Sequence, residues 1–149
     1  MRDTPTDWLI LAALIAPWLG LTWLCLRKRP RVALGGASHL VVYASQTGHA
    51  QEIAEATHAA VLRADPEARL VCANRLDLAD LDGADRIFFV VATSGEGDAP
   101  DDAGDLDRAL AEDDVDLTGV QVAILALGDR RYTHFCAFGE RLRTWCEAM

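Results

Sequence analysis

The chain has 149 residues, of which 51% are hydrophobic and 25% are charged, enough for one domain of ordinary size with a packed core. Its formal net charge is −9, and the part from residue 39 onward holds nine Lys and Arg against 21 Asp and Glu. A surface this acidic repels phosphates, which argues against nucleic-acid binding, and it suits a positively charged protein partner.

The first predicted element is an apolar stretch near the N-terminus. Residues 8–26 contain no charged side chain, and a helix of this length spans about the ~30 Å hydrocarbon core of a bilayer. The basic residues Arg27, Lys28, Arg29 and Arg31 follow, and by the positive-inside rule they stay in the cytoplasm. We therefore expect a single-pass protein of the cell membrane. Its expected parts are an extracytoplasmic N-terminus at 1–7, a transmembrane helix at 8–26, a basic flank and tether at 27–38, and a cytoplasmic domain at 39–149.

Two alternatives to a membrane anchor are a cleaved signal peptide and a buried soluble helix. A signal peptide has a basic start and a shorter apolar core. Here Asp3 and Asp7 stand beside Arg2 before the apolar run, and the basic cluster comes after it. This order of charges favours the anchor.

Strand-like and helix-like segments alternate from residue 39 onward. Apolar, mostly β-branched runs predict strands at 39–44, 69–73, 86–92 and 120–127. Amphipathic segments predict helices at 51–63, 102–112 and 138–148, with a turn or short helix at 77–83. The alternation predicts an α/β fold, a doubly wound parallel sheet with helices on both faces. Ligands of such sheets bind beyond the carboxyl ends of the strands, so the loops after the first, third and fourth strands are the candidate site.

The cysteines give no sign of a metal centre. Cys25, Cys72, Cys136 and Cys146 form no C-x-x-C pair and have no histidine at metal-ligand spacing. We expect free thiols in a reducing compartment and no metal site.

The first loop, residues 45–50, reads Ser-Gln-Thr-Gly-His-Ala and precedes a predicted helix. Hydroxyls and free backbone N–H groups at the positive end of a helix form an anion site. The loop has no lysine and neither the G-x-x-x-x-G-K nor the G-x-G-x-x-G spacing, so a phosphate monoester fits better than a nucleoside triphosphate. Ordinary helix capping by Ser and Thr is the alternative.

The other two loops suit a flat ring. Residues 93–102 contain Gly95 and Gly97 on either side of an acid, which lets backbone approach a planar group closely. Residues 127–136 contain Tyr132 and Phe135, and an exposed aromatic there can stack on a heterocycle. Core packing is the alternative for both aromatics, and it fits Phe135 better.

Together the segments YASQTGHAQEIAE, VVATSGEGDAPDDA and LALGDRRYTHFCAFG resemble the flavodoxin-like FMN domain of the diflavin reductases, over about residues 40–145. That family includes the sulfite reductase flavoprotein subunit and NADPH–cytochrome P450 reductase. The resemblance implies an FMN phosphate site at Ser45, Gln46, Thr47, Gly48, His49 and Ala50. It implies that one edge of the flavin ring lies along Thr93, Ser94, Gly95, Glu96 and Gly97, with the Gly95 carbonyl facing N5. It implies an opposite loop of Leu127, Gly128, Asp129, Tyr132, His134, Phe135 and Cys136, with Tyr132 stacked on the ring.

The chain departs from the family at three points. His49 stands where the family usually has a small residue such as Thr, and Ser94 stands where P450 reductases carry an aromatic. The family's strand order is 2-1-3-4-5, and the fifth strand is missing, so we expect 120–127 to form an exposed apolar edge. A truncated chain and a partner that supplies the strand both explain this.

The expected function is that of a membrane-anchored FMN module that relays single electrons. Its expected partners are a reductase domain or protein that binds FAD and NADPH, and a basic acceptor protein. The sequence contains no segment that could bind NADPH, and we expect no catalytic residue. The alternatives are a flavin-free remnant of a larger diflavin reductase and a signalling receiver domain. Receivers need an acidic pair and a phosphorylatable Asp where this chain has Ser45-Gln46 and Thr93-Ser94.

Overall fold

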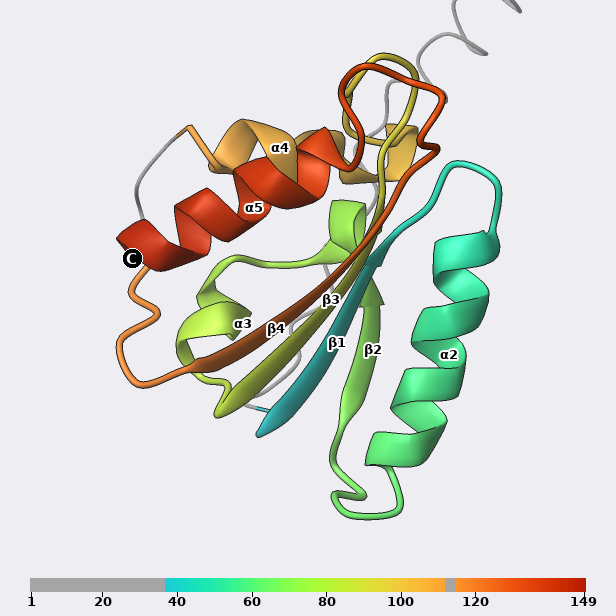
Figure 1. Cartoon of the computed structure of the whole chain (residues 1–149). Coiled ribbons are helices and arrows are strands. Elements are labelled where there is room, and N and C mark those ends of the chain that lie inside the picture. Colours follow the sequence, from blue (N-terminus) through green and yellow to red (C-terminus); the bar gives the residue numbers. More distant parts are fainter. Residues whose placement is uncertain (1–36, 112–114) are drawn as a thin grey trace, which may run out of the picture. The chain divides into compact units, whose positions relative to one another are not determined.

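Four parallel strands form the centre of the domain in this computed structural model, which describes residues 37–111 and 115–149. The strands are β1 (His39–Ala44), β2 (Arg69–Cys72), β3 (Arg86–Ala92) and β4 (Gln121–Leu127). They pair in the order β2-β1-β3-β4, which confirms the predicted sheet (Figure 1).

The helices follow the predicted alternation, with one correction. They are α2 (His49–Val61), α3 (Ala79–Asp82), α4 (Gly104–Ala109) and α5 (Ala137–Ala148). Two 3-10 turns, η1 (Ala73–Arg75) and η2 (Asp101–Ala103), complete the set. The single helix predicted at 102–112 is instead the turn η2 followed by the six-residue α4. Gly104 and a run of aspartates have low helix propensity, which keeps this element short.

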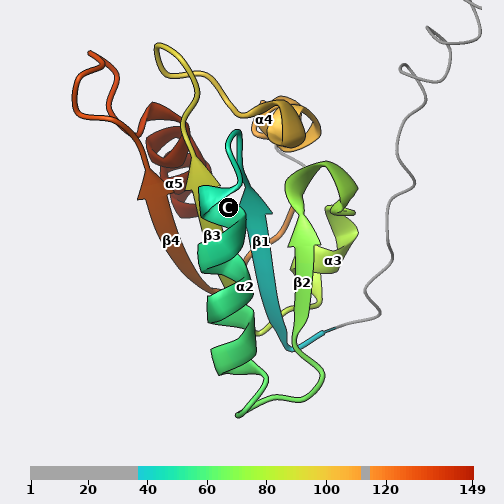
Figure 2. The same cartoon turned by 90° about the vertical axis from the view of Figure 1, so that its right-hand side faces the viewer.

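The two faces of the sheet have separate cores, as the alternation of side chains along a strand requires. On one face Leu40, Phe89 and Val91 pack under α4 and α5. On the other face Val41 and Val90 pack against α2. Figure 2 shows α2 on the near side of the sheet and α5 on the far side.

Strand β4 is an open edge within the described residues, because it pairs only with β3. Its sequence QVAILAL carries no charge, and Leu125 is 46% exposed. An uncharged apolar edge strand is a template for pairing with other chains. The edge expected from the sequence is therefore present.

The described ranges contain no helix that is both long and apolar enough to cross a bilayer. The transmembrane segment predicted at 8–26 and most of the tether lie outside these ranges. The anchor thus stays a prediction.

A hydrogen-bonded aspartate ties the start of β1 to the loop before β2. The Asp65 carboxylate accepts a hydrogen bond from Ser38 Oγ at 2.5 Å and one from the Glu67 N–H at 3.0 Å, and its Oδ2 lies 2.7 Å from His39 Nδ1. The Ser38 hydroxyl and the Glu67 amide, which favour the ionised carboxylate, lower the pKa of Asp65 from its usual value.

This cluster predicts acid-sensitive stability. Because its pKa is lower in the folded state, the ionised Asp65 stabilises the fold at pH values above its unfolded-state pKa of about 3.9. This contribution to stability disappears as the pH falls through the folded-state pKa. Asp65→Asn should therefore lower the melting temperature at pH 7 and should approach the wild type near pH 3, as measured by circular dichroism. The control Asp85→Asn alters an exposed carboxylate and should follow the wild type throughout. If the melting temperature of Asp65→Asn differed from that of the wild type by the same amount at every pH, the stability would not depend on the ionisation of Asp65.

Candidate functional site

The loops after β1, β3 and β4 emerge at one end of the sheet, as Figures 1 and 2 show. They lie beyond the carboxyl ends of parallel strands, where ligands of this fold class bind. The structure thus brings all the predicted site residues to one rim.

The first loop has the form of an anion cradle. Ser45 Oγ accepts a hydrogen bond from the Gly48 N–H at 3.0 Å, and Gly48 adopts φ 91°, a conformation that favours glycine. Within the described residues no hydrogen bond occupies the backbone N–H groups of Gln46, Thr47, His49 and Ala50. Four free N–H groups at the start of a 13-residue helix suit a phosphate.

The side chains of this loop divide into two groups. Those of Thr47 and His49 are exposed, and His49 Nδ1 lies 3.7 Å from Glu52 at the surface. Ala50 is buried in the core under α2, so only its N–H can serve a ligand. The Gln46 side chain is bonded to Asp101.

The second loop is a tight turn held by backbone bonds. Ser94 and Asp98 exchange N–H···O bonds of 2.9 and 2.8 Å, and Gly95 and Gly97 have φ values of 48° and 121°. Arg141 Nη1 on α5 donates to the Gly97 carbonyl at 2.7 Å. Glu96 is exposed at the tip.

The third loop displays two aromatic rings. Tyr132 is 46% exposed and Phe135 is 45% exposed, and the Arg130 guanidinium lies 5.7 Å from the Phe135 ring centroid. Core packing of Phe135 is therefore wrong, because its ring lies at the surface under a cation. Arg131 pairs with Asp129 and lowers the pKa of that carboxyl, which keeps it ionised.

The remaining predicted residues of this loop support it from within. Leu127 packs with the core under α2, and Cys136 is buried with Sγ 3.5 Å from the Ala126 carbonyl. Burial raises the pKa of the Cys136 thiol. A Cβ at Gly128 would lie 2.8 Å from the Cys136 nitrogen, so glycine is needed there. The His134 Cβ packs against Gly97 of the second loop.

The second and third loops nearly close on each other. Thr93 N–H donates to the Leu127 carbonyl at 2.9 Å, and the hollow between the loops measures about 30 Å³, roughly the room of one water. Thr93 Oγ1 in this hollow is buried and has no hydrogen-bond partner among the described residues. The exposed aromatics and the unpartnered hydroxyl fit a polar heterocycle that stacks on the rim, and a deeper position requires the loops to separate.

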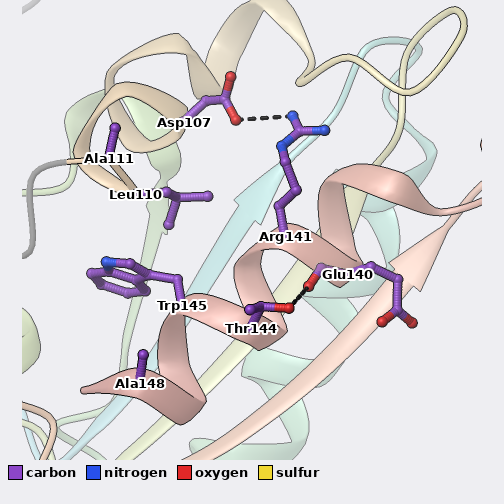
Figure 3. Close-up of a pocket in the computed structure, with 8 residues that line it drawn as sticks. All are labelled: Asp107, Leu110, Ala111, Glu140, Arg141, Thr144, Trp145 and Ala148. Carbon is purple, nitrogen blue, oxygen red and sulfur yellow. Dashed lines mark hydrogen bonds and ion pairs between the residues drawn. The ribbon is translucent and has the colours of Figure 1, made fainter.

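A wider hollow lies elsewhere among the described residues, between α4 and α5 (Figure 3). Its volume is about 630 Å³, and Leu110, Trp145 and the Arg141–Asp107 ion pair line it. It lies away from the strand ends and has no cradle of free N–H groups, so the three loops remain the better site for a phosphorylated ligand.

Three supporting residues were missed by sequence reasoning. Asp101 and Asp102 bond the first loop, and Arg141 holds the second. Asp101 and Asp102 stand within a segment singled out for its acids, but their partners lie more than 50 residues away in sequence. Arg141 lies on a helix in a sequence that gives no sign of its bond to Gly97.

Residues 41–149 match the flavodoxin family. NADPH–cytochrome P450 reductase of Bos taurus is 42% identical over 117 residues, which covers 70% of this chain and 16% of the reductase. The sulfite reductase flavoprotein alpha-component of Vibrio parahaemolyticus is 32% identical over 111 residues, covering 70% of this chain and 17% of that protein. The chain thus spans less than a fifth of the length of these relatives.

Among solved structures, oxidised flavodoxin 2 from Bacillus cereus superimposes with a TM-score of 0.67 at 28% identity. The match covers 75% of each chain. The agreement extends the likeness from sequence to the arrangement of strands and helices.

Proposed function

Because the chain belongs to the flavodoxin family, we propose that it is an electron-transfer module with its flavin held at the three loops. Family membership and the similarity to the reductases indicate FMN, which confirms the cofactor predicted from the sequence. The observation that carries the proposal is the cradle of free N–H groups at the start of α2, beside two loops with exposed aromatics.

In this proposal the protein binds and orients the cofactor, and FMN supplies the one-electron chemistry. The phosphate lies on the N–H groups of Gln46, Thr47, His49 and Ala50 and on the Thr47 hydroxyl. Tyr132 stacks on the ring and shields it from water. The turn at 94–98, fixed by Arg141, presents its backbone to the edge of the ring.

Charge near the ring tunes the cofactor. Glu96, Asp98 and the ionised Asp129 belong to the two loops that flank the proposed ring position. Their negative charge disfavours further negative charge on the flavin and so lowers its reduction potential.

The proposed partners are those of the similar reductases. A domain or protein that binds FAD and NADPH delivers electrons, and a basic acceptor protein receives them. The acidic surface steers both encounters, so association should slow as salt rises. The segment at 8–26 holds the module at the cytoplasmic face of a membrane, which confines encounters to that plane.

A flavin titration tests the proposal. The full chain, solubilised in detergent, should bind FMN with a stoichiometry of one, seen as quenching of flavin fluorescence. Riboflavin should bind more weakly, because it lacks the phosphate that the cradle holds. Protein that leaves the fluorescence of added FMN unchanged would reject the proposal and favour the flavin-free alternative.

The stacking role of Tyr132 gives a separate prediction. Tyr132→Ala should weaken FMN binding by about tenfold or more, because an aromatic contact contributes ~0.5–1.5 kcal/mol beyond its buried area. Tyr132→Phe is the matched control and should stay within about threefold of the wild type. Since Tyr132 is half exposed, both variants should melt like the wild type. Equal FMN affinities for the Ala and Phe variants would remove Tyr132 from the site.

A further inference from the structure

An acidic segment, residues 101–102, forms hydrogen bonds with the first two residues of the phosphate loop. Asp102 Oδ1 accepts a hydrogen bond from the Ser45 N–H at 2.8 Å, across 57 positions of sequence. Next to it, Gln46 Nε2 donates to Asp101 Oδ2 at 3.1 Å, and the Asp101 N–H donates to Gln46 Oε1 at 3.2 Å. Three hydrogen bonds thus join residues 45–46 to residues 101–102, and we call this set the loop clamp.

The loop clamp rests on a fixed base. Asn74 Nδ2 on η1 donates to the Asp101 carbonyl at 2.9 Å, and Asn74 Oδ1 accepts from the Asp105 N–H at 3.1 Å. The second oxygen of Asp102 lies 3.7 Å from Cys72 Sγ at the end of β2. The carboxylate is therefore held between the ends of two strands and does not swing freely into solvent.

The position of Asp102 is electrostatically unfavourable for an anion site. A carboxylate beside a bound phosphate repels it, and the half-buried Asp102 is screened less than a surface group. Any favourable contribution of Asp102 to phosphate binding must then come from the hydrogen bond that its carboxylate accepts. By occupying the Ser45 N–H, it fixes the first peptide of the loop, whereas the N–H groups of Gln46 and Thr47 stay without a hydrogen bond among the described residues.

We propose that Asp102 is a positioning residue for the flavin phosphate: it holds the Ser45 N–H, so that the unbonded N–H groups of the loop converge on the anion. This inference rests on the proposed FMN site. It assigns to Asp102 two opposite effects, a favourable one through the acceptor oxygen and an unfavourable one through the charge.

Two substitutions separate these effects. Asp102→Asn keeps an acceptor oxygen and removes the charge, whereas Asp102→Ala removes both. Dissociation constants for FMN and riboflavin are measured on the detergent-solubilised full chain by fluorescence quenching. Asp102→Ala should weaken the binding of FMN at least tenfold and that of riboflavin less than twofold, because only FMN has the phosphate that the loop binds. Asp102→Asn should bind FMN as tightly as the wild type or more tightly.

The control Asp85→Asn removes one negative charge at the opposite end of the sheet and should change neither constant. Equal weakening of FMN and riboflavin by Asp102→Ala would overturn the proposal, as would unchanged FMN affinity. If Asp102→Asn lost as much FMN affinity as Asp102→Ala, the charge and not the acceptor oxygen would be the favourable feature, and this too would overturn the proposal. Wild-type protein that binds no FMN would reject the proposed function itself, a result distinct from these.

A second measurement holds even if Asp102→Ala fails to fold. The Ser45 amide proton, bonded to a carboxylate, should resonate downfield in the NMR spectrum of the flavin-free protein. It should move upfield in Asp102→Asn, where the acceptor is neutral. A Ser45 resonance that does not respond to this substitution would show that the hydrogen bond is absent and overturn the proposal.

Discussion

Gly139→Ala should destabilise the domain by about 2 kcal/mol, within the ~1–3 kcal/mol typical of overpacked cores. Gly139 lies in the first turn of α5, and a Cβ there would overlap the Cβ of Ala126 on β4. The Ala126 Cβ is fixed to the backbone of β4 and cannot rotate away, so the strain is relieved only if α5 moves away from the strand. The gain in helix propensity from Gly to Ala, ~1 kcal/mol, offsets only part of this strain.

Gly104→Ala is the matched control for that substitution. Gly104 has helical angles of φ −59° and ψ −31°, and a Cβ there meets no atom within 4 Å. Its replacement should raise stability by about 0.5 kcal/mol, because alanine reduces the freedom of the unfolded chain. Thermal unfolding followed by circular dichroism measures both. If Gly139→Ala melted at or above the wild-type temperature, the claim that α5 packs closely against β4 at this position would be wrong.

The Gly139 contact also links stability to the flavin site. Helix α5 begins directly after the third loop, and Arg141 on the same helix holds the Gly97 carbonyl of the second loop. A displaced α5 would therefore move both loops that flank the proposed ring. We expect FMN affinity in Gly139→Ala to fall even at temperatures where the variant remains folded.

The central strands β1 and β3 were predictable because they are largely buried on both faces of the sheet. The runs HLVVYA and RIFFVVA are apolar after their first residue, and the predicted bounds of β1 and β3 agree with the structure at both ends. The region after Pro100 was less predictable. Its aspartates and Gly104 weaken helical preference, and tertiary packing of Leu106 and Ala109 decides where α4 lies.

The loops of the site were predictable from the sequence, but the hydrogen bonds that hold these loops in place were not. Ser45–Ala50 and the two glycines of the second loop could be identified because helix starts and positive φ angles restrict the residue types. The bonds of Asp102 and Arg141 join distant segments, and no local pattern encodes them. The exposure of Phe135 was mispredicted, because a phenylalanine near a helix usually packs into the core and here packs under Arg130. The contacts of the predicted residues with FMN stay predictions.

Thr47→Glu should strongly weaken the binding of FMN and leave the binding of riboflavin unchanged. Thr47 is exposed in the middle of the cradle, so the fold tolerates a longer side chain, and the new carboxylate lies beside the phosphate position. Two unit charges ~4 Å apart near a protein surface repel by about 4 kcal/mol. Screening by solvent reduces this, and we expect a loss of about a hundredfold or more, since each ~1.4 kcal/mol is tenfold.

Thr47→Gln is the control for that substitution, because it has nearly the same size as Glu and no charge. It should lose only the contribution of the threonine hydroxyl, a few-fold in FMN affinity, since a neutral hydrogen bond contributes ~0.5–1.5 kcal/mol. Raising the salt concentration should restore part of the FMN affinity of Thr47→Glu and none of that of Thr47→Gln, because only repulsion is screened. If Thr47→Glu weakened FMN and riboflavin equally, the phosphate would not lie at the start of α2, and the site would have to be sought at another part of the rim.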